Sequence, residues 1–176
     1  MKNLIKIISK LTFFVTFLII GSLNVSNANV SLIQSKFGAG STGGGMIFNP
    51  DGTKFYWTDI VADTIKQINL TTPYDLSSQT GSTITFDLDP ATTICQNAFG
   101  LAINDDGTRM FIPCYNTDTI KEIELSTAYL VSSGSHDDSN DLDVSTQTGS
   151  PSGVTFSSDG KTLFVADQVN DKSAKD

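Results

Sequence analysis

Five aspartates recur at matching places in this sequence, and their carboxylates could bind a cation or a cationic ligand. They are Asp59, Asp63, Asp118, Asp167 and Asp171. Asp63 and Asp118 are each followed by Thr-Ile, which is typical of a fixed turn. An aspartate can brace such a turn by accepting hydrogen bonds from nearby backbone amides. The sequence therefore allows two interpretations, an acidic binding surface and a set of turn residues.

The only histidine, His136, belongs to a polar run at residues 135–141. Ser-His-Asp in direct succession is not a catalytic triad, because the three groups must converge from separate elements. Oxygen ligands that suit calcium recur along the run, at Asp137, Ser139, Asp141 and Asp143. Leu142 and Thr148, however, stand where an EF-hand loop has its glycine and glutamate. We therefore expect a solvated loop, with weak calcium binding as the alternative, and we predict no catalytic residue and no cofactor.

The chain has two cysteines, Cys95 and Cys114. Cys95 precedes an expected strand that begins at Gly100, and Cys114 ends the next expected strand. The turn between these strands brings the two neighbourhoods together, and an oxidising compartment favours a disulfide. We predict a Cys95–Cys114 bridge that staples the second repeat, and two inert thiols are the alternative.

These residues lie within a segment that is repeated along the sequence. Residues 45–78 recur without a gap at residues 100–133, and a third copy begins at Gly153. Self-similarity at a fixed period predicts a repeat architecture. Each copy carries an Asp-Gly pair, which indicates a tight hairpin turn because these residues tolerate positive backbone φ. The pairs are Asp51-Gly52, Asp106-Gly107 and Asp159-Gly160.

Each full copy contains four strand-sized pieces. The second piece is apolar throughout, as in residues 55–57 and 110–112, and this predicts a strand covered on both faces. The third and fourth pieces alternate apolar and polar residues, which predicts one buried face. No window of useful length has a helical period. We therefore predict an all-β chain of β-propeller-like blades, each made of four antiparallel strands.

The repeats also set the expected boundaries. A strand and a flexible connector occupy residues 29–44, blades occupy 45–99 and 100–152, and a partial blade occupies 153–176. These make about two and a half blades, an incomplete ring, because propellers close with roughly 4 to 8. We expect a truncated copy of a longer propeller; the alternatives are a ring closed by self-assembly and a small open stack. We expect close packing of strands near the central axis of the propeller at three glycines, Gly45, Gly100 and Gly153.

Two segments carry a family resemblance. Residues 48–56 and 157–166 resemble blades of secreted bacterial propellers of the YVTN type. Residues 56–59 spell Tyr-Trp-Thr-Asp, the tetrapeptide of low-density-lipoprotein-receptor propellers, but they do so only once. The resemblance implies that the connections between the second and third strands line a rim where ligands often bind. It also implies an alternative function, part of a lactonase or quinoprotein with its site in the central channel.

The first 28 residues are typical of a secretory signal peptide. Lys2, Lys6 and Lys10 precede an apolar run at residues 11–23, and small residues precede an expected cleavage after Ala28. The run is too short for the roughly 20 residues of a membrane span, so we expect no stable span after cleavage. We predict a secreted or periplasmic protein.

Cleavage would move the formal net charge from −8 to −11, and such an acidic chain is a poor partner for nucleic acid. The sequence therefore favours an exported, non-enzymatic scaffold that binds an unknown protein or small ligand. Self-association through open blade edges is a further expectation, because unpaired edge strands invite it. A non-functional gene fragment is the remaining alternative.

Overall fold

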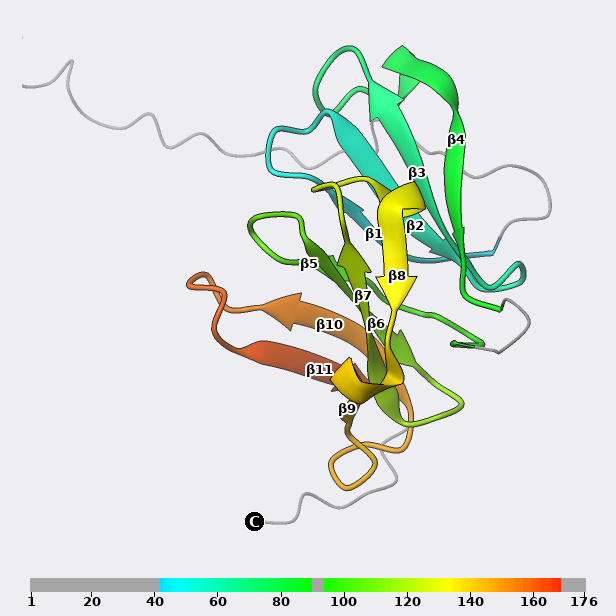
Figure 1. The fold of residues 1–176 in the computed structure, drawn as a ribbon, viewed down its shortest axis with the longest axis vertical. Coiled ribbons are helices and arrows are strands. Elements are labelled where there is room, and N and C mark those ends of the chain that lie inside the picture. Colours follow the sequence, from blue (N-terminus) through cyan, green and yellow to red (C-terminus); the bar gives the residue numbers. More distant parts are fainter. Residues whose placement is uncertain (1–41, 90–93, 169–176) are drawn as a thin grey trace, which may run out of the picture. The chain divides into compact units, whose positions relative to one another are not determined.

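The structure is a computed structural model, and it describes residues 42–89 and 94–168. The expected signal peptide, residues 29–41 of the expected strand and connector, and Asp171 lie outside these ranges. The first sheet has four antiparallel strands that pair in chain order (Figure 1). These are β1 (Gly43–Phe48), β2 (Lys54–Asp59), β3 (Thr64–Leu70) and β4 (Gln79–Asp87).

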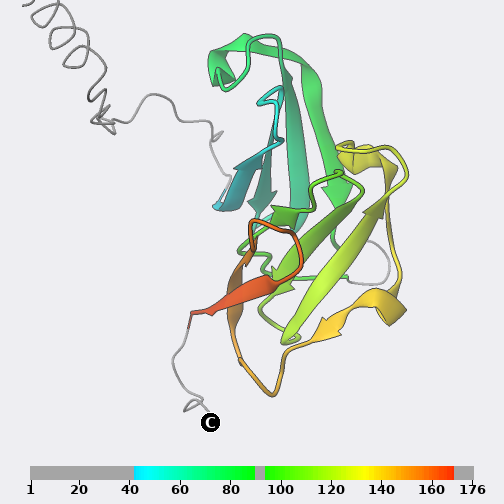
Figure 2. The same ribbon diagram turned by 90° about the vertical axis from the view of Figure 1, so that its left-hand side faces the viewer.

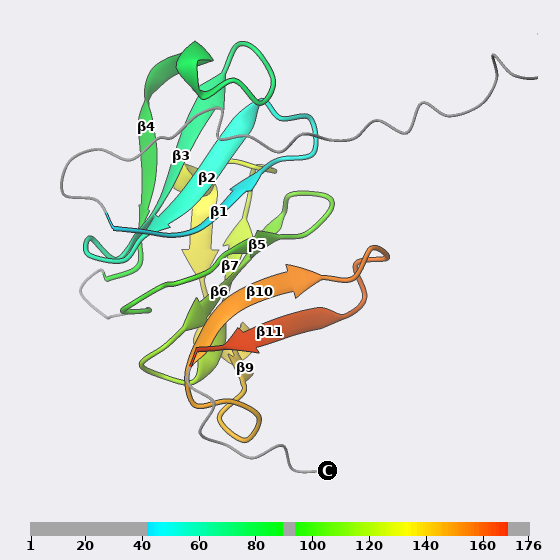
Figure 3. The ribbon, with the colours of Figure 1, turned by 180° about the vertical axis from the view of Figure 1, so that it is seen from behind.

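The second sheet repeats this order, but its fourth strand is split. Its strands are β5 (Ala102–Ile103), β6 (Arg109–Cys114), β7 (Thr119–Leu125) and β8 (Gly134–His136), and β9 (Leu142–Asp143) also pairs with β7. The third sheet is the antiparallel pair β10 (Pro151–Phe156) and β11 (Leu163–Asp167), orange and red in Figure 3. The prediction of an all-β fold built from four-stranded antiparallel blades is confirmed.

In the described part of the chain, three short 3-10 helices lie beside the strands: η1 (Leu76–Ser78), η2 (Val131–Ser133) and η3 (Asp138–Asn140). η1 and η2 occupy matching places between the third and fourth strands of their sheets, whereas η3 lies in the split between β8 and β9. Within the described ranges, no helix is long and apolar enough to cross a membrane.

The Asp-Gly pairs form the predicted hairpin turns between the first and second strands. Gly52 and Gly107 both have φ of 71°, and Gly160 has φ of 67°. In the first turn, Oδ1 of Asp51 accepts hydrogen bonds from the backbone N–H (2.8 Å) and the hydroxyl (2.5 Å) of Thr53. Asp106 and Thr108 repeat this pair of bonds in the second sheet.

A tyrosine closes each of the first two turns. Tyr74 donates its backbone N–H to the carbonyl of Gly52 and its hydroxyl to the carbonyl of Pro50. Tyr129 makes the matching bonds to Gly107 and Asp105 in the second sheet. In each of these two repeats, the segment before the fourth strand is therefore hydrogen-bonded to the turn between the first and second strands.

Successive sheets pack closely along their first strands. A Cβ atom at Gly45 would lie 2.7 Å from the Cα of Gly100, and one at Gly100 would lie 3.0 Å from the Cα of Gly153. Real Cβ atoms do not approach this closely, so glycine is needed at Gly45. These contacts agree with the expectation of crowding at Gly45 and Gly100, whereas a Cβ at Gly153 would meet the Cβ of Ala166 at an ordinary 3.4 Å.

The first two sheets are also joined by buried polar contacts. The hydroxyl of Tyr56 donates to the carbonyl of Tyr129 at 2.8 Å, and Tyr56 has no exposed surface. Burial raises the pKa of the Tyr56 hydroxyl far above its ordinary value, so this hydroxyl stays a donor. The backbone N–H of Val131 in η2 donates to Oε1 of Gln67, which is also fully buried. In Figure 2, η2 (yellow) lies beside β4 of the first sheet (green), which it contacts.

Candidate functional site

Asp59, the first of the predicted binding residues, lies inside the fold. Only 2% of its surface is exposed. Its Oδ1 accepts the backbone N–H groups of Val61 and Ala62, and its Oδ2 lies 2.6 Å from the Nζ of Lys66. The carboxylate therefore already has a cationic partner, and it holds the turn between β2 and β3.

Asp63 and Asp118 take the same backbone conformation in matching turns, with φ of 46° and 50°. The carbonyl of Asp63 accepts the N–H of Leu88, and the carbonyl of Asp118 accepts that of Val144. The side chain of Asp63 accepts the N–H of Asn97, in the segment that leads to the second sheet. The prediction that the carboxylate braces its own turn is therefore wrong for Asp63, because this carboxylate accepts an amide 34 residues away.

The four described aspartates of the predicted set all lie at or next to the connection that follows the second strand of a sheet. Asp59 and Asp63 flank the β2–β3 turn, Asp118 lies in the β6–β7 turn, and Asp167 is exposed at the end of β11. Asp118 is half-buried. The structure brings Asp59 and Asp63 together in one turn and places the other two at the equivalent points of later sheets.

Cys95 and Cys114 form a disulfide, with their Cα atoms 5.5 Å apart and both side chains buried. Cys114 stands at the position that Asp59 occupies in the first repeat. The bridge ties the segment that enters the second sheet to the middle strand of that sheet. Because Cys114 takes the place of an aspartate, β6 lacks the carboxylate that would otherwise pair with the lysine of β7.

That lysine, Lys121, finds its acid in the split fourth strand. Its Nζ lies 2.6 Å from Oδ2 of Asp141, and the other oxygen of Asp141 lies 2.9 Å from Nε2 of His136. The side chain of His136 is only 9% exposed. The expectation of a solvated loop is therefore wrong for His136, whose ring lies against Asp141, whereas residues 137–140 are exposed as expected.

The oxygens that suggested calcium serve local structure. Hydrogen bonds from the N–H and the hydroxyl of Ser139 hold the pKa of Asp137 below its ordinary range. Bonds from the hydroxyl and the N–H of Ser145 do the same for the pKa of Asp143. His136, Asp138 and Asp141 do place ligand atoms within 4.8 Å of one another. The ammonium of Lys121 is the cation beside that group, at 4.0 Å from Asp138 and 2.6 Å from Asp141.

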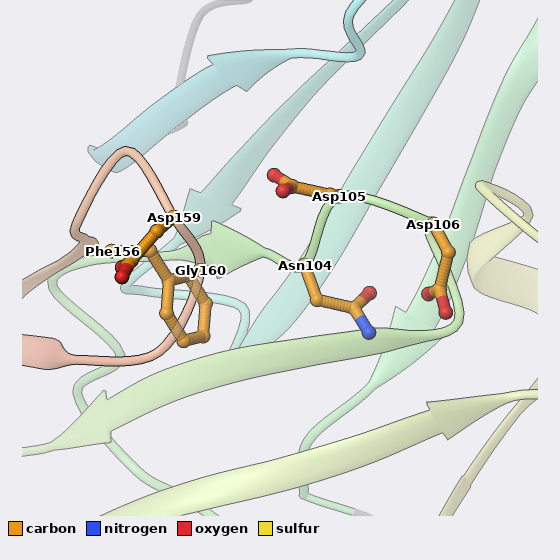
Figure 4. A pocket seen from close by; sticks show the side chains of 6 residues that line it. All are labelled: Asn104, Asp105, Asp106, Phe156, Asp159 and Gly160. Carbon is orange, nitrogen blue, oxygen red and sulfur yellow. The ribbon is translucent and has the colours of Figure 1, made fainter.

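A pocket that the sequence did not indicate lies between the hairpin turns of the second and third sheets (Figure 4). It encloses about 250 Å³ and is lined by Asn104, Asp105, Asp106, Phe156, Asp159 and Gly160. Asp105 stands where the first repeat has Pro50, so the carboxylate is an addition to the repeat. That substitution was visible in the sequence, but the nearness of the third hairpin was not.

The pocket is negatively charged. Hydrogen bonds from Thr108 hold the pKa of Asp106 below its ordinary value of 3.8. Hydrogen bonds from Ser157 and Lys161 do the same for Asp159. Both groups therefore stay ionised at neutral pH, and Phe156 supplies an apolar wall. Such a lining suits a cationic group and disfavours an anionic one.

Solved structures resemble this arrangement of sheets. A candidate 6-phosphogluconolactonase from Bacteroides fragilis superposes with a TM-score of 0.53 and 18% identity, over 75% of this chain and 33% of that one. A second candidate 6-phosphogluconolactonase, from Bacteroides uniformis, gives 0.51 and 18% over 77% and 36%. A functionally unknown protein from Desulfotomaculum acetoxidans gives 0.52 and 16% over 71% and 35%.

The fold is β-propeller-like. The chain spans about a third of the length of the structures it matches. No protein-family model matches it, and no curated protein matches it. At these identities the likeness concerns the propeller-like fold alone.

Proposed function

We propose that the chain is an exported, non-enzymatic propeller repeat module of the YVTN type that acts as a binding or structural scaffold. The observation that carries this proposal is the use of its repeated polar side chains. Asp51 and Asp106 hold matching hairpin turns, and the matching lysines Lys66 and Lys121 each pair with an aspartate of their own sheet. The polar residues that are the same in successive repeats therefore have structural roles. Binding is then left to surface residues that differ between the repeats.

Within this module, a cationic ligand is the class that the described surfaces favour. The pocket between the second and third hairpins carries Asp105, Asp106 and Asp159. At the opposite ends of the strands, Asp118 and Asp167 remain proposed contacts for such a ligand.

A lactonase is the second candidate, because two of the matching structures are named as candidate 6-phosphogluconolactonases. A phosphorylated lactone is an anion, and it would meet the ionised Asp106 and Asp159 in the described pocket. Like charges in a confined site repel. This charge balance disfavours binding of the lactone in that pocket, which is not the central channel where the site of such an enzyme is expected.

Two measurements test the proposal. Fractionation of the source cell and N-terminal sequencing should find a mature chain outside the cytoplasm that begins at Asn29. Proton release from 6-phosphogluconolactone should be the same with and without the purified chain. An intact cytoplasmic chain would overturn export, and saturable turnover of the lactone would replace the scaffold with the enzyme.

A further inference from the structure

The pocket between the second and third hairpins differs in two residues from the matching joint between the first and second. Asp105 stands where the first hairpin has Pro50, and Phe156 stands where the second sheet has Ile103. The pocket therefore has a carboxylate and an aromatic ring that the matching positions of the first joint do not supply.

The carboxylate of Asp105 is available to a ligand. Asp105 is exposed, and within the described residues no hydrogen bond or ion pair engages its carboxylate, since its bond to Tyr129 uses the backbone carbonyl. In Figure 4 this carboxylate points towards the third hairpin, and a Cβ at Gly160 would lie 3.4 Å from its Oδ2. Asp105 therefore faces the opposite wall of the pocket.

The other two carboxylates of the pocket are held by their own hairpins. Oδ1 of Asp106 accepts two hydrogen bonds from Thr108. Oδ1 of Asp159 accepts bonds from the hydroxyl of Ser157 and the backbone N–H of Lys161. Both carboxylates therefore contribute negative charge at fixed positions.

The spacing of these carboxylates favours an organic cation over a metal ion. In the described part of the chain, only His136, Asp138 and Asp141 bring three ligand atoms within 4.8 Å of one another, so the three acids of the pocket do not. A calcium or magnesium ion needs several oxygens at about 2.0–2.6 Å from one point. A guanidinium has five N–H donors spread over a plane, so it reaches acceptors that lie further apart.

Phe156 suits the same kind of ligand. Its ring is half-buried and packs edge to face against Phe111, with ring centroids 5.0 Å apart, so its position is fixed. Guanidinium groups stack on aromatic rings, and the stem of an arginine packs on apolar surface. The pocket volume of about 250 Å³ is below the roughly 300–1,000 Å³ of sites for whole drug-sized ligands, so it suits a single side chain.

We propose that this pocket binds the guanidinium of an arginine side chain presented by a partner polypeptide. Asp105 accepts its N–H donors and Phe156 stacks on it, while the two fixed carboxylates attract its charge. The chain's own arginine does not serve, because Nη1 of Arg109 lies 3.3 Å from Oε1 of Glu122. A free amino acid would bring its own carboxylate into this negative pocket, and like charges repel. The inference rests on the scaffold function proposed above and names its ligand.

Calorimetric titration of the full chain with Nα-acetyl-arginine amide tests the proposal. Binding should saturate at one site per chain and weaken as salt is raised, because salt screens exposed charges. Nα-acetyl-citrulline amide has the same shape without the charge, and it should bind at least about tenfold more weakly. Nα-acetyl-lysine amide should also bind more weakly, since its ammonium lacks the planar fork of donors. Free arginine should bind more weakly than the capped form.

Two variants separate binding from folding. Asp105→Asn keeps the backbone carbonyl that holds Tyr129 but removes the charge, so it should weaken binding at least about fivefold. Phe156→Ile, which places the second repeat's residue in the pocket, should also weaken binding. Asp138→Asn is the control, because it removes the same charge from an 89% exposed side chain outside the pocket and should leave binding unchanged.

Four results would overturn the proposal. They are the absence of saturable binding, equal binding of the citrulline or lysine compound, displacement of the arginine compound by stoichiometric Ca²⁺, and unchanged binding in Asp105→Asn. Tighter binding of free arginine would overturn the polypeptide source. All are binding readouts, so they can fail while the export and the absence of lactone turnover that test the scaffold function hold.

Discussion

The Nζ of Lys121 lies 2.6 Å from Oδ2 of Asp141, and the two side chains are 11% and 9% exposed. The matching lysine of the first sheet, Lys66, pairs instead with Asp59 on its neighbouring strand. Because Cys114 replaces that acid in the second sheet, the split fourth strand supplies another. A buried lysine thus keeps a carboxylate partner although the partner comes from a different element.

Loss of Asp141 should therefore destabilise the chain strongly. Asp141→Ala leaves the ammonium of Lys121 buried without its partner, which costs about 3 kcal/mol or more of unfolding free energy. Asp138→Ala is the matched control, because Asp138 is 89% exposed and 4.0 Å from the same ammonium. Its loss should cost less than about 1 kcal/mol. Urea unfolding of both variants checks this, and equal effects would contradict the assignment.

Gln67 should be needed for the joint between the first two sheets. Gln67→Leu leaves the N–H of Val131 without its acceptor, so we expect a loss of about 1–3 kcal/mol in unfolding free energy. Gln79→Leu is the control, because Gln79 makes a single exposed bond to Gly81 and should change stability by under about 0.5 kcal/mol. Denaturant unfolding measures both, and a silent Gln67→Leu would show that the joint does not depend on this bond.

Two glycines with the same backbone conformation should respond differently to alanine. Gly52 and Gly81 have φ of 71° and 69°. An added Cβ meets nothing within 4 Å at Gly81, whereas at Gly52 it meets the ring of Tyr74. Gly81→Ala should cost about 1 kcal/mol for the left-handed backbone. Gly52→Ala should cost about 1–3 kcal/mol more from overpacking. Thermal unfolding compares them, and equal losses would exclude a role for the tyrosine.

Periodicity was enough to predict the sheets. The Asp-Gly turns formed because glycine at positive φ suits a tight hairpin, and the apolar run at residues 55–57 became the buried strand β2. The same reasoning failed at residues 134–143. Their polar composition resembles a solvated loop, but the side chains of His136 and Asp141 are each only 9% exposed, because Asp141 meets the need of Lys121 for a charged partner. That need depends on a contact across 20 residues, which composition does not encode.

The candidate site was less predictable than the fold. The repeated aspartates indicated a position in the fold, but not whether their carboxylates point outward. Asp59 turned out to be enclosed by Lys66 and two backbone amides. The pocket escaped prediction because it forms where two repeats meet, and Asp105 and Asp159 are far apart in sequence. Sites of that kind need the packing of one sheet on the next.

The disulfide should stabilise the second sheet. Cys95 and Cys114 close a loop with a sequence separation of 19, and such a bridge restricts the unfolded chain by about 3 kcal/mol. Replacing both cysteines with alanine should lower the unfolding free energy by a similar amount. The parent chain should lose the same stability in a strong reductant at the denaturant midpoint, and the double variant should not respond. A reductant-insensitive parent would contradict a stabilising bridge.

Acid should weaken the hairpin turns. The pKa values of Asp51, Asp106 and Asp159 lie below the ordinary 3.8, chiefly because the side-chain hydroxyls of Thr53, Thr108 and Ser157 donate to the ionised carboxylates. A folded-state pKa below the unfolded value gives stability that is present above the unfolded value and lost as pH falls through the folded one. Stability should therefore decline below about pH 4.

Asp106→Asn should lower stability at pH 7 and make its fall towards pH 3 shallower, as followed by urea unfolding at each pH. An unchanged slope in Asp106→Asn would mean that these turns do not set the acid limit.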